Sequence, residues 1–446
     1  MSNTERVLLA RASFSFLLFI GLAGGLIFST EKPIYIKAKK IYGCEKARIL
    51  ENGAILIEGG KIIRVDKKSR PPENAQVIDF TDRIIVPGFV DAHCALGYHA
   101  EDLSVKTEPP PPAGTPIPWW VPAPPEMPPM PEARFQSAQA VFYKDFSFMK
   151  SLAGGITSAK IAIPADYLVD GTSACVKLFA DSASDLILKN PAGEEFSFVV
   201  KENATERYAE LKKLFLEAQE YEKGFKKYEQ DLKIYLDKKK AKDQKKEAQA
   251  QKQEPAEQTL EEPKEPRKDE NQEIILQVLR GKIPAMIRAS RINEIEAAVK
   301  IAEEFKLNLV LVGGQEAYRI AGDLASKRIP VIAGPDAVYV KKGEKINYIK
   351  ALLSKNVPVA FSSQSNAGTP FLLFQLTYAV QYGLTEEEAL NILTVNAARI
   401  LGIADKVGTL EAGKDADFVV LSGEPFEFGT KVEKVYVNGK LAYPKE

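Results

Sequence analysis

The stretch of sequence that decides the fold is Ile84-Ile85-Val86-Pro87-Gly88-Phe89-Val90-Asp91-Ala92-His93-Cys94-Ala95. Its apolar part, residues 84–90, predicts a buried strand that delivers the carboxylate of Asp91 and the imidazole of His93 to its carboxyl end. Enzymes built on a barrel of parallel strands place their chemistry at that end. The stretch therefore predicts a barrel whose site begins with these two side chains.

Further along the chain, apolar strand-like runs alternate with helical patterns, as in a parallel sheet wrapped by helices. Eight strands make a TIM barrel, so the sequence predicts an α/β fold with a (β/α)8 barrel over residues 84–404. A last helix is expected over residues 385–401, capped by Thr385. The eight strand-like runs are residues 84–90, 156–163, 174–179, 195–200, 283–288, 307–312, 329–333 and 357–361.

Short strands also stand at both ends of the chain. They flank two-residue hairpin turns, Gly59-Gly60 near the amino end and Asn438-Gly439 near the carboxyl end. Small open sets of strands cannot bury a face alone. We therefore expect residues 31–83 and 405–446 to pair into one composite β-sandwich.

The first 30 residues carry an export or membrane signal. Arg6 and Arg11 precede an apolar run over residues 14–28, which is typical of a signal peptide. The run is close to the lower limit of about 17 residues for a membrane span, so an uncleaved anchor is the other reading. Both readings predict an exported body that is periplasmic, secreted or anchored.

The composition argues against a nucleic-acid-binding protein and against a disulfide-stabilised one. Lys+Arg and Asp+Glu both number 60, so no global basic charge indicates a nucleic-acid partner. Three cysteines, Cys44, Cys94 and Cys175, are too few for a disulfide framework. We interpret them as small buried residues.

A first insertion in the barrel, residues 108–131, is dense in proline and holds Trp119 and Trp120. Proline fixes the backbone in an extended form that cannot join a sheet. Two interpretations stay open: a lid or aromatic binding surface over the pocket mouth, or a loop whose tryptophans pack on the barrel rim.

A second insertion, residues 205–271, begins with apolar residues at heptad spacing, which predicts a long helix with one apolar stripe. Residues 238–269 are almost all Lys, Glu, Gln, Ala and Pro and are expected not to order. We favour a stripe that covers the barrel wall over a coiled-coil arm that binds a partner. The stripe comprises Leu211, Leu214, Ala218, Tyr221, Phe225, Tyr228, Leu232 and Tyr235.

Two motifs resemble the amidohydrolase superfamily, and within it the imidazolonepropionase-like proteins. Asp91-Ala92-His93-Cys94-Ala95 is similar to the Asp-x-His-x-His that ends their first barrel strand, with Ala95 in place of the second histidine. Residues 408–417, Gly-Thr-Leu-Glu-Ala-Gly-Lys-Asp-Ala-Asp, resemble their closing segment Gly-x-Leu-x-x-Gly-x-x-Ala-Asp. The resemblance covers the chain from about Ile34 to its end, apart from the two insertions.

The resemblance implies a divalent metal bound at the ends of strands one, four, five, six and eight. His93 is the only ligand retained, and the whole chain has just one other histidine, His99, whereas the usual site needs about four. The positions implied for the other ligands carry Ala95, Ser197 (with Lys201 the next lysine), Arg288, Gly313 and Gln364.

Each replacement removes a ligand, and Arg288 adds a fixed positive charge that repels a cation. We therefore expect no bound metal and predict that Arg288 occupies the position of the metal, facing Asp91 and Gln364. His93 is then either a general base or a hydrogen-bonded packing residue.

The leading interpretation is a catalytically inactive, exported member that acts as a binding or assembly subunit. Its partner would be a homologous amidohydrolase subunit or a second copy, with a small molecule in the barrel as a further ligand and membrane contact only through the N-terminal segment. The alternative is an active hydrolase of C–N bonds in cyclic amides, with a zinc-type metal and an atypical site built on Asp91, His93 and Lys201.

Overall fold

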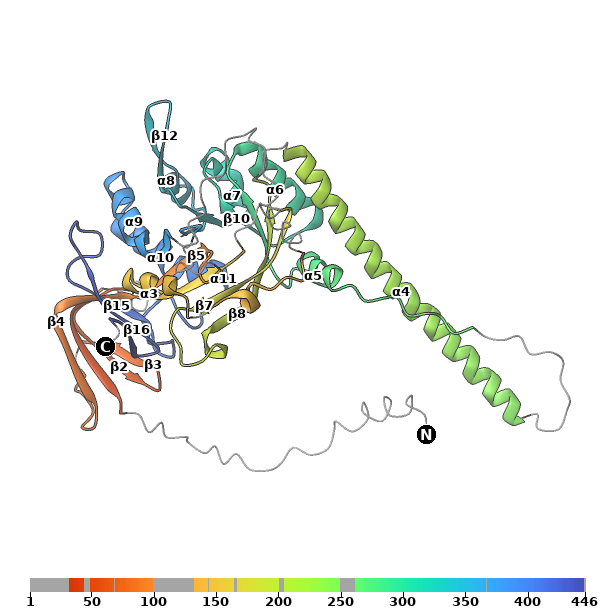
Figure 1. Ribbon diagram of the computed structural model, residues 1–446, viewed down its shortest axis with the longest axis horizontal. Coiled ribbons are helices and arrows are strands. Elements are labelled where there is room, and N and C mark those ends of the chain that lie inside the picture. The colour runs from red at the N-terminus through yellow and green to blue at the C-terminus, as the bar shows by residue number, and fades with distance from the viewer. Residues whose placement is uncertain are drawn as a thin grey trace, which may run out of the picture.

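The computed structural model describes residues 32–43, 49–67, 69–98, 132–142, 144–163, 167–199, 204–248, 261–365 and 367–444. The N-terminal export segment, Cys44, Lys201 and both tryptophans lie outside these ranges. Within the described ranges, no helix is both long and apolar enough to cross a bilayer. The chain builds two large sheets, and helices surround one of them (Figure 1).

The larger sheet has eight strands in the order β14-β11-β10-β9-β8-β7-β6-β5. Because its outer strands β14 and β5 contact each other, the sheet nearly closes, which confirms the predicted α/β barrel. Its strands are β5 (Phe89–Cys94), β6 (Ile156–Ile161), β7 (Val169–Lys177), β8 (Ile187–Ser197), β9 (Ala285–Ala289), β10 (Leu309–Gly313), β11 (Val331–Ala333) and β14 (Val359–Phe361).

The first barrel strand differs from the one predicted over residues 84–90. Residues up to Pro87 belong to β4 (Gln76–Pro87) in the second sheet, and β5 starts only at Phe89. Gly88 lets the chain pass close to Thr157, because a Cβ at this position would stand 2.1 Å from the Thr157 hydroxyl oxygen. Apolar residues continue through this break, so hydrophobicity predicts one strand where the chain changes sheets.

The all-parallel barrel that the sequence predicts is wrong for one strand. β7 runs antiparallel to both of its neighbours, β6 and β8. A parallel crossover needs a dozen or more residues, whereas only residues 162–168 join β6 to β7 and residues 178–186 join β7 to β8. The start of β7 therefore lies at the carboxyl ends of its neighbours, which is the end where a barrel site forms.

The second sheet combines strands from both ends of the chain in the order β17-β16-β15-β4-β1-β2-β3. β4 joins the two sets, because it pairs in parallel with β1 and antiparallel with β15. Both predicted hairpin turns are present, with positive φ at Gly59, Gly60, Asn438 and Gly439. The other strands are β1 (Ile34–Ile41), β2 (Leu50–Glu58), β3 (Lys61–Asp66), β15 (Phe418–Leu421), β16 (Val432–Val437) and β17 (Lys440–Tyr443).

Two short helices stand where one was predicted, and the second of them packs against inward residues of the barrel strands. The single helix predicted over residues 385–401 is broken at Thr394 into α10 (Glu386–Leu393) and α11 (Val395–Leu401). The Thr394 hydroxyl donates to the carbonyl oxygen of Leu390 at 2.6 Å. Leu401 of α11 packs in one cluster with Val310 and other inward residues of the barrel strands.

The remaining helices of more than one turn pack mainly around the barrel (Figure 1). They are α3 (Phe146–Ala153), α5 (Glu270–Leu279), α6 (Ile292–Phe305), α7 (Ala321–Lys327), α8 (Tyr348–Leu353) and α9 (Leu372–Gln381). A two-stranded hairpin, β12 (Val338–Lys341) and β13 (Glu344–Asn347), stands apart from both sheets.

The longest helix, α4 (Ala204–Ala248), starts against the barrel and then projects away from it (Figure 1). Near its start Leu211, Phe215 and Ala218 are buried. The ring of Phe215 lies 5.7 Å from that of Phe196 on β8 and 5.1 Å from that of Phe305 on α6. This part of the predicted stripe covers the barrel wall, as expected.

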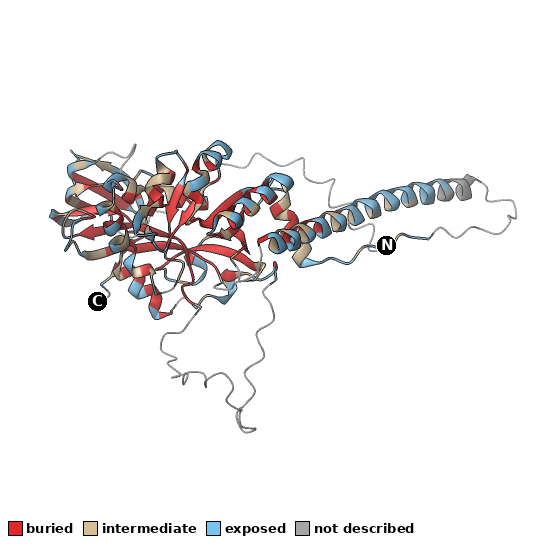
Figure 2. Cartoon of the chain, turned by 90° about the horizontal axis from the view of Figure 1, so that it is seen from above, coloured by how far each residue is buried: buried red, intermediate tan, exposed pale blue. Residues whose placement is uncertain are grey.

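The outer part of α4 contradicts the expectation of no order for residues 238–248, because the helix continues to Ala248, whereas residues 249–260 lie outside the described residues. Its surface is mostly exposed (Figure 2), so burial does not hold it. Lys, Glu, Gln and Ala are strong helix formers, and pairs such as Lys226 with Glu222 at 2.9 Å support the helix from outside. The composition that predicts disorder is thus also one that sustains an exposed helix.

Candidate active site

A bulge in the first barrel strand sets the position of His93. β5 pairs with β6 at Asp91 and again at Cys94, and the register shifts between these two points. In that interval Ala92 and His93 stand opposite Lys160 of β6. A β-bulge of this kind re-aims a side chain, and here it brings the imidazole beside side chains of β6 and β8.

Three side chains from three strands form a buried chain of polar contacts. Lys160 Nζ lies 2.5 Å from Glu195 Oε1, and Glu195 Oε2 lies 3.8 Å from His93 Nδ1. The Lys160 side chain is fully buried and that of Glu195 is 6% exposed. In the described part of the chain, His93 Nδ1 has no hydrogen-bond partner. The Glu195 carboxylate therefore lies between the ammonium group of Lys160 and the imidazole of His93.

Asp91 is bound by the segment that follows β14. The Ser363 hydroxyl donates to Oδ2 at 2.6 Å, and the backbone N–H groups of Ser363 and His93 donate to Oδ1 at 3.1 and 3.2 Å. Gln364 donates its backbone N–H to the His93 carbonyl oxygen at 2.9 Å and its side-chain Nε2 to the Gly334 carbonyl oxygen at 2.6 Å. The structure thus brings Asp91, His93 and Gln364 together.

Arg288 does not pair with Asp91, so that prediction is wrong. Its Nη2 lies 3.0 Å from Oδ2 of Asp170, whose side chain is 1% exposed. Asp170 reaches the carboxyl end of the barrel because β7 runs antiparallel and starts there. Lys201, the remaining predicted site residue, lies outside the described residues.

Burial changes the protonation of the site. It raises the pKa of Asp91 to about 6, although the Ser363 hydrogen bonds act in the opposite direction. Burial also holds the pKa of His93 well below its usual range, and the charges of Lys160 and Arg288 lower it further. At neutral pH His93 is therefore a neutral imidazole.

Two neighbouring thiols show the same effect of burial. It raises the pKa of Cys94 well above its ordinary value and that of Cys175 to about 12. Both cysteines are buried and unbridged, as expected from the sequence. A buried thiol of this kind is a poor nucleophile.

A further carboxylate, Glu194, precedes Glu195 on β8 and points to the opposite face of the sheet. Its side chain is fully buried, and neither of its oxygens has a hydrogen-bond partner among the described residues. Burial raises its pKa well above the usual value, and the nearby charges of Glu195 and Asp170 add to the effect. These surroundings favour the protonated carboxyl.

The side chains in the described part of the site do not fit the divalent metal that the resemblance implies. His93 is the only imidazole there, and the three nearby carboxylates are held by Lys160, Arg288 and Ser363. Within the described ranges, no three His, Cys, Asp or Glu side chains are grouped so that they could hold a metal ion. Two fixed positive charges in the same place oppose a third.

Reasoning from the sequence missed Lys160, Glu195 and Asp170. Lys160 is the one charged residue in the buried strand Ile156–Ile161, and a charge in such a strand requires a partner. That signal could have identified Lys160. Asp170 gives no comparable signal, because its place depends on the direction of β7.

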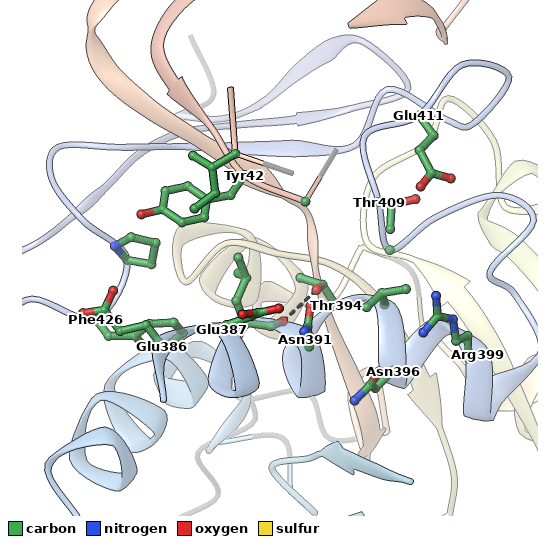
Figure 3. Close-up of a pocket in the computed structure, with 16 residues that line it drawn as sticks. Tyr42, Glu386, Glu387, Asn391, Thr394, Asn396, Arg399, Thr409, Glu411 and Phe426 are labelled. Carbon is green, nitrogen blue, oxygen red and sulfur yellow. Dashed lines mark hydrogen bonds between the residues drawn. The ribbon is translucent and has the colours of Figure 1, made fainter. Parts of the chain in front are cut away.

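A cavity of about 390 Å³ lies beside α10 and α11 (Figure 3). Tyr42, which follows β1, stands on one side of it, and Asn391 and Thr394 lie on the other (Figure 3). The exposed side chains of Glu387 and Arg399 are also part of its lining. The cavity is separate from the cluster around His93, because none of that cluster's residues lines it.

Comparisons with known proteins agree with this architecture. The family model described as "Amidohydrolase family" matches residues 84–442. The crystal structure of an amidohydrolase from Thermotoga maritima MSB8 is 31% identical and superposes with a TM-score of 0.68, covering 92% of this chain and 99% of that one.

Curated relatives match over shorter stretches. Imidazolonepropionase of Thermoplasma volcanium is 37% identical over 108 residues, which are 22% of this chain and 26% of that protein. Imidazolonepropionase of Maricaulis maris is 29% identical over 156 residues, or 34% of this chain and 39% of that protein. The chain thus spans between a quarter and two-fifths of the length of these two relatives. The family match over most of the barrel and the second sheet, together with the near full-length likeness to a solved amidohydrolase, shows that this chain belongs to the amidohydrolase family.

Proposed function

We propose that this member of the amidohydrolase family is an exported binding or assembly subunit that does not carry out metal-dependent hydrolysis. The observation that carries the proposal is the fully buried ammonium of Lys160, 2.5 Å from Glu195. A metal that used Glu195 as a ligand would have to displace Lys160 and leave its charge buried without a partner. That loss is strongly unfavourable.

A second ion pair supports the same conclusion. Arg288 stands where the resemblance implies a histidine ligand, and it forms an ion pair with Asp170. Arginine stays protonated at any ordinary pH, so this positive charge does not leave the site. Side-chain cations thus hold two of the carboxylates that a metal would need, and they neither activate water nor exchange ligands as a metal does.

The rival function is hydrolysis of a C–N bond in a cyclic amide at an atypical site. Its support is the neutral imidazole of His93, whose Nδ1 lacks a hydrogen-bond partner in the described part of the chain. A neutral imidazole accepts a proton, and Asp91, with a pKa of about 6, lies next to it. This function needs an attacking water that His93, with Asp91 beside it and a metal bound, would activate.

Metal retention and turnover separate the two functions. The full chain is incubated with zinc or manganese, dialysed and analysed for metal, and then assayed against a panel of lactams, hydantoins and imidazolones. We expect less than stoichiometric metal and no turnover above the rate without protein. Stoichiometric metal together with turnover, both lost on His93→Ala, would establish the rival function.

The assembly role needs a separate measurement. The native protein is extracted from the cell envelope with mild detergent, and its size is compared with that of the purified chain on a native gel. We expect the native protein to run as a larger complex. If both run at the mass of one chain, the assembly role is wrong, and a binding role alone remains.

A further inference from the structure

Large aromatic side chains gather on one outer surface of the molecule. Phe371 ends the short helix η4 (Thr369–Phe371), Phe374 and Tyr378 follow on α9, and Phe428 lies on the loop between β15 and β16. Their exposed fractions are 58%, 63%, 44% and 82%. We call these four residues the aromatic patch.

The patch is continuous across two parts of the chain. The rings of Phe374 and Phe428 meet edge to face with centroids 6.4 Å apart. Between them runs a groove of about 350 Å³, lined also by Ala153 at the end of α3 and by Leu373. An exposed apolar surface of this kind marks an interaction site.

The helix α9 has two apolar faces, and only one serves the fold. Leu372, Leu376 and Ala379 are buried against the barrel. The aromatic residues repeat at positions 371, 374 and 378 on the other face, with the spacing of one side of a helix. The core therefore accounts for the first face and leaves the second for a partner.

Lysine side chains accompany the aromatic rings. Lys345 Nζ lies 6.0 Å from the ring centroid of Tyr378 and 4.4 Å from that of Tyr382. On α3, Lys150 Nζ lies 4.9 Å from the ring centroid of Phe146, which is 46% exposed. Aromatic rings beside lysines suit the boundary of a lipid bilayer, where rings enter the headgroup layer and amines meet lipid phosphates.

The start of the chain gives a reason to choose a bilayer as the partner. The apolar run over residues 14–28 is separated from β1 by residues 29–33, which reach at most about 17 Å. β1 runs for 8 residues, about 26 Å, from this start to its other end, where Lys40 pairs with Glu424 at 2.8 Å beside the loop of the patch. If the run stays in a membrane and β1 lies along its surface, the loop of the patch reaches the same surface.

We propose that the aromatic patch rests on the surface of a phospholipid bilayer as a second membrane contact beside the N-terminal segment. Figure 1 shows α9 and the seven-stranded sheet on one side of the barrel and α4 on the other. With the patch side on the lipid, the projecting helix points away from the bilayer. This inference is independent of whether the barrel site hydrolyses a substrate.

The test places an environment-sensitive fluorophore on the full chain in a Cys44→Ser background. The label is attached at Phe428→Cys, with Leu216→Cys as the matched control, because Leu216 is 45% exposed on α4, away from the patch. The two other cysteines are buried and do not compete for the label. The protein is made in the presence of phosphatidylcholine vesicles containing phosphatidylglycerol, with and without nitroxide on the lipid chains.

At position 428 we expect a blue-shifted emission that nitroxide lipids quench, and at position 216 neither change. Adding Phe371→Asp and Phe374→Asp should abolish the quenching at 428 while the protein stays with the vesicles. Equal behaviour of the two labels would overturn the proposal. So would a blue shift at 428 that appears without lipid and grows with protein concentration, because a second copy would then cover the patch.

Discussion

The buried pair of Lys160 and Glu195 gives the sharpest prediction about stability. Lys160→Met removes the ammonium but keeps a side chain of similar length in the same space. The carboxylate of Glu195 then stays buried without its partner. Breaking one side of such a pair costs about 3–5 kcal/mol in the free energy of unfolding, which is a large part of the about 5–15 kcal/mol of a typical domain.

Two further variants make this number interpretable. Lys160→Met combined with Glu195→Met replaces both charges by apolar groups, so most of the lost stability should return. Lys327→Met is the control on the surface, because Lys327 is 30% exposed and pairs with Asp323 and with Glu303, each at 2.7 Å. Loss of each exposed pair should cost less than about 1 kcal/mol.

The assay is urea denaturation of all four proteins near neutral pH. A cost below about 1 kcal/mol, or a double variant as unstable as the single one, would refute the reasoning.

Glu194→Gln should stabilise the protein increasingly as the pH rises from about 5 to about 8, by at most about 1.4 kcal/mol per pH unit. The reason is that a carboxyl whose pKa is raised in the folded state destabilises the protein at pH values above the pKa of the unfolded state. An equal difference in unfolding free energy between the variant and the original protein at both pH values would contradict this. Ser363→Ala should raise the pKa of Asp91 above about 6 and cost about 1–3 kcal/mol at about pH 8 but less at about pH 5. Carboxyl NMR titration and urea curves check this, and an unchanged Asp91 pKa would contradict it. Deleting residues 211–269 should expose the barrel wall and cause aggregation, whereas deleting only residues 225–260 should leave thermal melting unchanged. Light scattering during melting compares the two deletions, and equal behaviour would show that the buried start of α4 is dispensable.

The sequence predicted the barrel because its strands contain short apolar runs, although the run over residues 84–90 hid the change of sheet at Gly88. It failed where chain direction matters, since nothing in the apolar run over residues 174–179, which overlaps the end of β7, shows that this strand runs antiparallel. The two-residue turns Gly59-Gly60 and Asn438-Gly439 were predictable because each fixes a hairpin by local backbone geometry. The extension of α4 to Ala248 was not, because one composition suits both a disordered linker and an exposed helix.

At the site, Asp91, His93 and Gln364 could be singled out from the sequence because each lies in or just after an apolar strand. It gave Arg288 the wrong partner, because the nearest carboxylate in the motif is not the nearest in space. Asp170 becomes the partner only once β7 is reversed. The pairing of Lys160 with Glu195 links two strands whose separation in the chain carries no local signal.

The composite sheet also determines when this protein can finish folding. β4 ends at Pro87 and its partner β15 begins at Phe418, so synthesis at about 5–20 residues per second leaves that edge of β4 without its partner for tens of seconds. An unpaired edge is a template for pairing with other chains. A newly made chain therefore needs protection of this edge until its last strands emerge, and truncation before β15 leaves the edge permanently open.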